Sequence, residues 1–384
     1  MFDNAIRPDS APLRARDLGV PFDGEPGPLN AITDVPGLEV GMTTIVRDEP
    51  EVARTGVTAI LPRGRERAGE PCAAGIAVLN GNGELTGRSW IEESGQFQAP
   101  IAITNSHAVG AVHRGVDAWM AEHHPRSAAA WMLPVVGETW DGYLNSINAD
   151  IVRPEHATTA LDGARSGAVP EGNVGGGTGM NCYGFKGGTG TSSRIVRSGD
   201  ASWTVGVLMQ ANFGSRSELR IAGRPLGRES QAPNPMEESG WFAEEAGAGL
   251  AARGGAGSVI VVVATDAPLL PDQCRALARR VPLGLARTGT TGSHFSGDIF
   301  LAFSTANAGG LGSRMTDGGG GALETVTHVP WGAIDELFRA VVEATEEAVV
   351  NALVAAETTI GRKGHVSHAL PHAELRAAFG SRTA

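Results

Sequence analysis

The stretch of sequence that decides the fold is AARGGAGSVIVVVA, at residues 251–264. Its small residues end at Gly257, and a run of β-branched apolar residues begins directly after Ser258. Such a run, bounded by glycine, predicts a buried strand. Ser258 therefore lies at the junction between a small-residue segment and a strand. Two interpretations are open at this point: an ordinary loop that enters a strand, or a self-cleavage site.

Self-cleavage would give Ser258 a second chemical group. Cutting the Gly257–Ser258 bond divides the chain into pieces of 257 and 127 residues and leaves a free α-amine on Ser258. Glycine at the acyl side leaves the scissile carbonyl open to attack by the serine hydroxyl, with an ester as the intermediate. An α-amine has an ordinary pKa of about 7.7–8.0, so it can act as a general base near neutral pH.

A second polar pair, Ser296 and Asp298, directly precedes a predicted strand at residues 299–304. Residues at positions i and i+2 of an extended chain face the same side, so the two side chains can converge. Asp298 could then orient Ser296 or the new ammonium group, as the third member of a catalytic triad orients its base. The alternative is a turn in which Asp298 accepts backbone N–H groups.

Two further side chains could complete such a site. Asn212 follows a predicted buried strand at residues 204–211, and its amide could donate to an oxyanion. One such donor lowers a barrier by about 2.7–4 kcal/mol, although capping a turn is the alternative role. Tyr143 could add a hydroxyl to the oxyanion site or shape a substrate pocket beside Trp140, or it could be a core aromatic residue.

Composition and charge narrow the class of protein. Hydrophobic residues make up 41% of the 384 residues, which is typical of a globular protein. The net charge of −11 argues against a nucleic-acid partner. Apolar runs fall far short of about 20 residues, and the N-terminus lacks a secretory pattern, so we expect no membrane span and a cytoplasmic location. The cysteines are too scattered for a disulfide framework: Cys72, Cys182 and Cys274.

Two motifs could suggest a bound cofactor or metal. The glycine-rich segment 172–179 lacks the phosphate-loop signature, and close backbone packing explains it better than nucleotide binding. Three histidines near the C-terminus have spacings of three and four, but glycine and proline interrupt a continuous helix there. We therefore expect no cofactor and no metal. The histidines are His365, His368 and His372.

Local patterns predict a layered protein of strands and helices, of the α+β or α/β class. The proline-rich residues 1–30 are expected to form an extended arm, and residues 31–384 a single domain. Hydrophobic periodicity predicts helices at 108–122, 272–280 and 333–357, with a short one within 241–250. The expected strands are 31–34, 38–41, 55–61, 74–79, 204–211, 259–265 and 299–304.

Taken together, the motifs resemble one family over residues 30 to 375. The chain is similar to the DmpA-type aminopeptidases, which comprise L-aminopeptidase/D-Ala esterase-amidases and β-peptidyl aminopeptidases. Any one motif is weak, but their joint order is specific. The motifs, in chain order, are NAITDVPGLEVG (30–41), NGNGELTG (80–87), ITNSH (103–107), ETWDG (138–142), GNVGGGTGM (172–180), QANFG (210–214), Gly257-Ser258, SGD (296–298) and AAET (355–358).

The resemblance implies an αββα four-layer sandwich of the α+β class, like that of N-terminal-nucleophile hydrolases but differently connected. It implies a precursor cut into residues 1–257 and 258–384, which stay associated and often assemble as tetramers of such heterodimers. Its site residues would be the nucleophile Ser258, the proton-relay helpers Ser296 and Asp298, the oxyanion donor Asn212 and, in an assisting role, Tyr143.

The function that follows is a self-processing serine aminopeptidase. It would release small N-terminal L-, D- or β-amino acids from short peptides, amides or esters through an acyl-enzyme on Ser258. Glu138 is a candidate for binding the substrate ammonium, and Trp140 could form a pocket wall. Two alternatives are acyl transfer to an amine, as in ornithine acetyltransferases of similar fold, which use threonine, and a non-catalytic binding protein whose chain stays intact.

Overall fold

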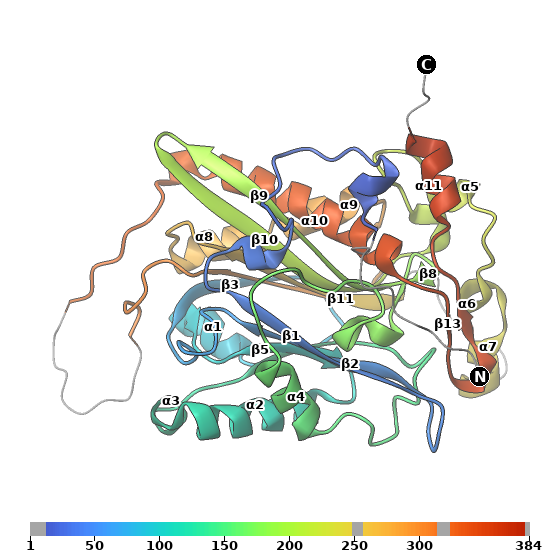
Figure 1. The fold of residues 1–384 in the computed structure, drawn as a ribbon, viewed down its shortest axis with the longest axis horizontal. Helices are drawn as coiled ribbons and strands as arrows, with labels where there is room; N and C mark the ends of the chain where they lie inside the picture. Colours follow the sequence, from blue (N-terminus) through green and yellow to red (C-terminus); the bar gives the residue numbers. More distant parts are fainter. Residues whose placement is uncertain (1–12, 248–255, 313–322, 381–384) are drawn as a thin grey trace.

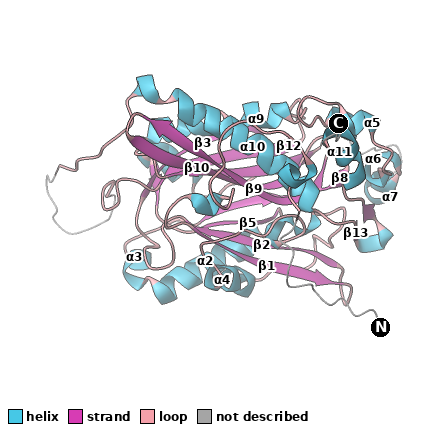
Figure 2. Ribbon diagram, turned by 45° about the horizontal axis from the view of Figure 1, so that its top comes forward, coloured by secondary structure: helices cyan, strands magenta, loops and turns pink. Residues whose placement is uncertain are grey.

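Two β-sheets packed face to face form the centre of the protein, and helices cover both outer faces (Figures 1 and 2). The computed structural model describes residues 13–247, 256–312 and 323–380. The layers run in the order helix, sheet, sheet, helix, which confirms the α+β class and the αββα sandwich expected from the resemblance.

The larger sheet has six strands in the order β4-β3-β12-β11-β10-β9. The strand after the Gly257–Ser258 junction, β11, lies at its centre, antiparallel to β10 and parallel to β12. The predicted strands at 204–211, 259–265 and 299–304 are therefore confirmed. The bounds are β3 Cys72–Gly81, β4 Gln96–Phe97, β9 Gly188–Ser198, β10 Ala201–Asn212, β11 Gly257–Thr265 and β12 Ser296–Ser304.

The smaller sheet has four strands in the order β1-β2-β5-β6. Only β5 and β6 are parallel to each other; the other two pairings are antiparallel. Two short hairpins complete the strands, β7 with β8 and β13 with β14. The bounds are β1 Glu39–Arg47, β2 Ala53–Leu61, β5 Ile101–Asn105, β6 Val135–Thr139, β7 Asn181–Cys182, β8 Phe185–Lys186, β13 Thr359–Ile360 and β14 Val366–Ser367.

Strand β11 is apolar on both faces because each face meets a different layer. Val259 and Val261 belong to a core that includes the helix α10, whereas Ile260 and Val262 belong to the core between the two sheets. Successive side chains of a strand point to opposite faces, so an unbroken apolar run is what a doubly covered strand requires. This explains why residues 259–264 show no alternation of polar and apolar residues.

Helices α2 and α4 cover the smaller sheet, and α8, α9 and α10 cover the larger one (Figure 1). Sequence periodicity predicted α2, α8 and α10 to within a few residues. The bounds are α1 Arg88–Ser94, α2 Val109–His123, α3 Pro125–Ala129, α4 Pro154–Asp162, α5 Leu226–Glu229, α6 Pro235–Glu238, α7 Trp241–Ala246, α8 Pro271–Ala278, α9 Val281–Arg287, α10 Asp335–Ala355 and α11 His372–Phe379.

The strand predicted at residues 31–34 is wrong, because the structure has a short 3-10 helix there, Ile32–Asp34. The Asp34 carboxylate accepts the backbone N–H groups of Leu29 and Ala31 at 3.0 and 3.1 Å. Such local side-chain bonds compete with strand pairing and favour a turn. The expected short helix within 241–250 is present as α7, although residues 248–250 lie outside the described residues.

An ion pair connects the segment before residue 32 to helix α10. Arg16 donates to the buried carboxylate of Glu347 on α10 at 2.7 Å, and Arg194 of β9 binds the same carboxylate. Leu18 is buried in the core that includes α10. Part of the predicted arm at residues 1–30 thus packs on the domain, and residues 1–12 lie outside the described residues.

Candidate active site

Ser258 is the second residue of β11, and its partner across the antiparallel pair is Asn212, the last residue of β10. Directly opposed residues on one face of an antiparallel pair hold their side chains close together. Both side chains are buried. The junction identified in the sequence therefore lies inside the protein, at one end of the central strands.

Two N–H donors converge on the Ser258 hydroxyl. The backbone N–H of Trp140 donates to Oγ at 3.1 Å, and the Asn212 side-chain amide lies at 3.5 Å. Trp140 directly follows β6 of the smaller sheet, so the candidate site forms where strand ends of both sheets meet. These donors hold the Ser258 hydroxyl in place, and they lie beside the position where an oxyanion would develop when Oγ attacks a carbonyl carbon.

The orientation of the Asn212 amide is fixed by its other two bonds. Its Oδ1 accepts the backbone N–H of Asn181 at 2.8 Å, and its Nδ2 donates to the Trp140 carbonyl at 2.9 Å. Only one of the two amide orientations satisfies both partners. The N–H group is therefore the end that faces Ser258, as the role of oxyanion donor requires.

Gly257 lies where a side chain would not fit. A Cβ at this position would be 2.0 Å from the backbone oxygen of Asn212, far inside van der Waals contact. Glycine at position 257 leaves its carbonyl unshielded, as expected from the sequence. The structure adds a packing reason, because β10 approaches this residue closely.

The predicted pair Ser296 and Asp298 is formed at the start of β12. The Ser296 hydroxyl donates to Asp298 Oδ1 at 2.5 Å, and the amide of Asn80 on β3 donates to Oδ2 at 2.9 Å. The backbone N–H of Val259 also bonds this carboxylate. Burial raises the pKa of Asp298, and the bonds from Ser296, Asn80 and Val259 act in the opposite direction.

Strand alternation places this pair and the Ser258 hydroxyl on opposite faces of the larger sheet. Ser296 and Asp298 are in phase with Phe300, which packs on the helical side. Ser258 is in phase with Ile260, which packs between the sheets. In the parallel register, Ser296 lies opposite residue 257 on the neighbouring strand. The backbone nitrogen of Ser258, which lies between the two faces, is therefore the group that the pair can assist.

Glu138 lies two residues before Trp140, on β6, and is buried. Its carboxylate accepts the Ser106 hydroxyl and the backbone N–H of Glu84. Burial raises its pKa, and these two donors act against that shift. A Cβ at Gly83 would lie 3.1 Å from Glu138 Oε1 and 3.1 Å from Cα of Gly297. The carboxylate is therefore close to the strand position that pairs with Ser258.

Tyr143 does not join the donors at Ser258. Its hydroxyl donates to the Val366 carbonyl at 3.3 Å, and its ring stacks on His365 with centroids 4.6 Å apart. Burial raises its pKa to about 12, so the phenol stays protonated near neutral pH. The ring also meets Trp241 edge to face, and Trp241 stacks on Trp140. The geometry thus gives Tyr143 a place in an aromatic wall beside Trp140, one of the three roles that the sequence left open.

Three contacts at the site were missed by sequence reasoning. The backbone N–H of Trp140 has no side-chain signal. Asn80 was named only as the first residue of the motif NGNGELTG, and Asn181 was not named, because neither pairing is local in sequence. Asn80 reaches Asp298 through the pairing of β3 with β12, which single-sequence periodicity does not reveal.

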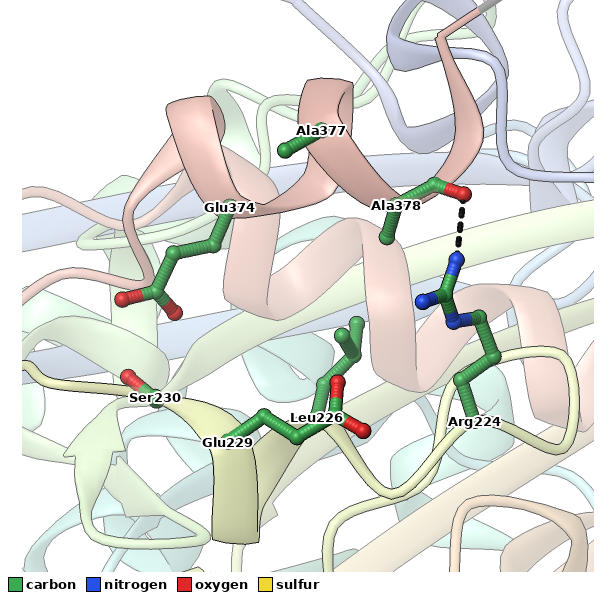
Figure 3. Close-up of a pocket in the computed structure, with 7 residues that line it drawn as sticks. All are labelled: Arg224, Leu226, Glu229, Ser230, Glu374, Ala377 and Ala378. Carbon is green, nitrogen blue, oxygen red and sulfur yellow. Dashed lines mark hydrogen bonds between the residues drawn. The ribbon is translucent and has the colours of Figure 1, made fainter.

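The described surface has hollows away from these residues. One of about 210 Å³ lies between α5 and α11, where Arg224 donates to the Ala378 carbonyl (Figure 3). Within residues 13–247, 256–312 and 323–380, no group of three or more His, Cys, Asp or Glu side chains could hold a metal ion. In the same residues, no helix is long and apolar enough to span a membrane.

Comparisons with known proteins identify the family and the fold of this chain. The model of peptidase family S58 matches residues 30–367. A β-peptidyl aminopeptidase, BapA of Sphingosinicella microcystinivorans, is 50% identical over 95% of this chain and 91% of its own length. The structure of an L-aminopeptidase D-Ala-esterase/amidase from Ochrobactrum anthropi, a variant of the Ntn hydrolase fold, gives a TM-score of 0.84 at 44% identity, covering 95% of this chain and 97% of that one. A β-aminopeptidase from Burkholderia sp. gives 0.85 at 45% identity, covering 96% and 100%.

Proposed function

Because the chain belongs to peptidase family S58 and is an aminopeptidase with an Ntn-hydrolase type of fold, we propose that it matures by cutting its own Gly257–Ser258 bond. Ser258 then serves as the nucleophile of the mature enzyme. The observation that supports this most strongly is the convergence of the Trp140 N–H and the Asn212 amide on Ser258 Oγ, at the junction itself.

Maturation requires one acyl shift and one hydrolysis. Ser258 Oγ attacks the Gly257 carbonyl carbon, the bond from that carbon to the Ser258 nitrogen breaks, and the nitrogen takes up the hydroxyl proton. Water then hydrolyses the resulting ester, which leaves a carboxylate on Gly257 and a free Ser258. Asn212 and the Trp140 N–H stabilise the negative charge of the tetrahedral intermediate, as oxyanion donors do.

Turnover repeats this chemistry on a substrate. The α-amine of Ser258 takes the Oγ proton as Oγ attacks the substrate carbonyl, and it returns the proton to the departing amine. The acyl group stays on Oγ until water releases it as an amino acid. Ser296 and Asp298 bind the α-ammonium and keep its pKa suited to both transfers, which is consistent with their position on the opposite face from Oγ.

Recognition of the substrate's free N-terminus is assigned to Glu138. The carboxylate is buried, and it lies close to the position that pairs with Ser258. Trp140, with Trp241 stacked on it, forms an apolar wall beside the nucleophile. These features favour short substrates with a small N-terminal residue. β-Amino acids are included because the relative from Sphingosinicella is a β-peptidyl aminopeptidase.

A panel of p-nitroanilides tests the proposed activity: β-alanyl, D-alanyl, L-alanyl and glycyl derivatives, each with its N-acetylated form. We expect hydrolysis of at least one free-amine substrate and none by Ser258→Ala. Glu138→Gln keeps the shape and removes the charge, so kcat/KM for that substrate should fall about 10- to 100-fold. Hydrolysis of the N-acetylated forms at a similar rate, or an equal effect of Glu138→Gln on both forms, would refute the assignment of Glu138.

A further inference from the structure

Lys186 is a fully buried cation that the proposed mechanism does not use. It lies on β8, and its ammonium donates to the carbonyl oxygens of Gly177, Met180 and Gly187 at 3.3, 2.9 and 2.8 Å. No carboxylate of the described chain forms a salt bridge with it. An ammonium has three N–H donors and no acceptor, so three carbonyls satisfy it completely.

One peptide group links this cation to the candidate site. The carbonyl of the Met180–Asn181 peptide accepts from Lys186, and the N–H of the same peptide donates to Asn212 Oδ1 at 2.8 Å. The other end of the Asn212 amide faces Ser258 Oγ. A continuous chain of donors and acceptors therefore runs from the buried charge through two amide groups to the nucleophile.

We infer that Lys186 is a positioning residue for the oxyanion donor, acting on Asn212 through the Met180–Asn181 peptide. Each bond in such a chain polarises the next, strengthening it by roughly 10–30% per bond, and the low dielectric of the interior preserves the effect. A positive charge at the far end makes the Asn212 N–H a stronger donor to an oxyanion. This inference rests on the role proposed for Asn212 in maturation and turnover.

The surroundings of Lys186 allow the charge to be removed without moving the peptide. The Met180 carbonyl also accepts the backbone N–H of Gly187 at 2.8 Å, and the pairing of β7 with β8 holds the same segment. Burial lowers the pKa of Lys186 to about 7 even though the nearby Cys182 and Asp141 act in the opposite direction, so the side chain carries its charge below pH 7. A neutral, similarly shaped side chain at position 186 therefore removes the charge and its three N–H donors, while the backbone bonds that hold the peptide stay.

The experiment is a double-mutant cycle on kcat and KM for the best p-nitroanilide, with the rate of precursor cleavage followed on the same proteins. The variants are Lys186→Met, Asn212→Ala and their combination, with Lys186→Gln as a second neutral variant should the first fail to mature. Arg216→Met is the matched control. Arg216 is also buried and donates to several backbone carbonyls, but it has no bond to the Met180–Asn181 peptide.

We expect Lys186→Met to lower kcat about tenfold with KM changed less than about twofold, because loss of the donor itself costs about 10²–10³. In the Asn212→Ala background the same change should lower kcat less than about twofold, since its target is gone. Equal losses in both backgrounds, no loss, or the same split for Arg216→Met would overturn the inference. If Asn212→Ala leaves kcat and precursor cleavage unchanged, the proposed oxyanion role of Asn212 fails instead.

Discussion

Replacing Asn80 with leucine removes a donor to Asp298 and leaves a side chain of similar size. The Asn80 amide donates to Asp298 Oδ2 at 2.9 Å and to the Ser293 carbonyl at 3.0 Å. A hydrogen bond to a charged group contributes about 1.5–3 kcal/mol. One pKa unit corresponds to 1.36 kcal/mol, so this loss should move the acid limb of activity upward by about one to two pH units.

The upward direction of this shift follows from the environment of the Asp298 carboxylate. Burial already raises the pKa of Asp298, and the Asn80 donor acts against that shift by favouring the charged form. Without the donor, Asp298 stays protonated to higher pH and cannot hold the α-ammonium of Ser258. Activity is therefore lost on the acid side and kept at high pH, where the carboxylate is ionised in both proteins.

The assay is the pH dependence of kcat/KM for a p-nitroanilide from pH 4.5 to 10. Asn82→Leu is the matched control, because its amide belongs to the same turn but donates to the Phe295 carbonyl, away from Asp298. We expect Asn80→Leu to shift the acid limb upward and Asn82→Leu to leave it in place. An unmoved acid limb in Asn80→Leu, or equal shifts in both variants, would show that Asp298 does not control the profile.

Three further changes test other parts of the account. Gly257→Ala places a Cβ 2.0 Å from the Asn212 backbone oxygen, so the junction must shift. Precursor cleavage, followed on denaturing gels, should therefore slow on the order of a hundredfold. An unchanged cleavage rate would contradict the close approach of β10 to residue 257. Trp241→Ala removes a buried ring that packs on Tyr143, so the free energy of unfolding should fall by about 3–5 kcal/mol. Denaturant titration measures this change, and a loss below about 1 kcal/mol would contradict the packing. Burial raises the pKa of Asp141 to about 7, so its contribution to stability is greatest below pH 4 and is lost as pH rises towards 7. Asp141→Asn should abolish this fall in the free energy of unfolding, which amounts to up to about 4 kcal/mol. If the melting temperatures of the wild type and the variant depend on pH in the same way, the burial of a titrating Asp141 is refuted.

Local rules predicted much of the fold. The apolar stripe of α10 and the β-branched run of β11 are signals within a single element, and both elements are present close to their expected bounds. The contact between Ser296 and Asp298 also follows from a local rule, because alternate residues of a strand share a face. In contrast, the 3-10 helix Ile32–Asp34 was missed because one carboxylate captures two backbone N–H groups.

The parts of the site that sequence could not predict depend on contacts between distant elements. Asn80 of β3 donates to Asp298 of the neighbouring strand β12, and the N–H of Asn181, in the hairpin of β7 and β8, orients Asn212. Tyr143 is a related case: three roles were open for it from the sequence, and its contacts with the Val366 carbonyl and the Trp241 ring come from distant parts of the chain. Periodicity contains no information on which strand ends meet, so these contacts required the assembled sheets.

The central claim is that Ser258 becomes an N-terminal nucleophile through cleavage of the bond that precedes it. Intact mass spectrometry of the denatured protein tests it most directly, on the wild type and on Ser258→Ala. We predict two wild-type species, with the masses of residues 1–257 and 258–384, and a single 384-residue species for the variant. A single uncut wild-type species in fresh and aged protein, or normal cleavage of Ser258→Ala, would contradict the account.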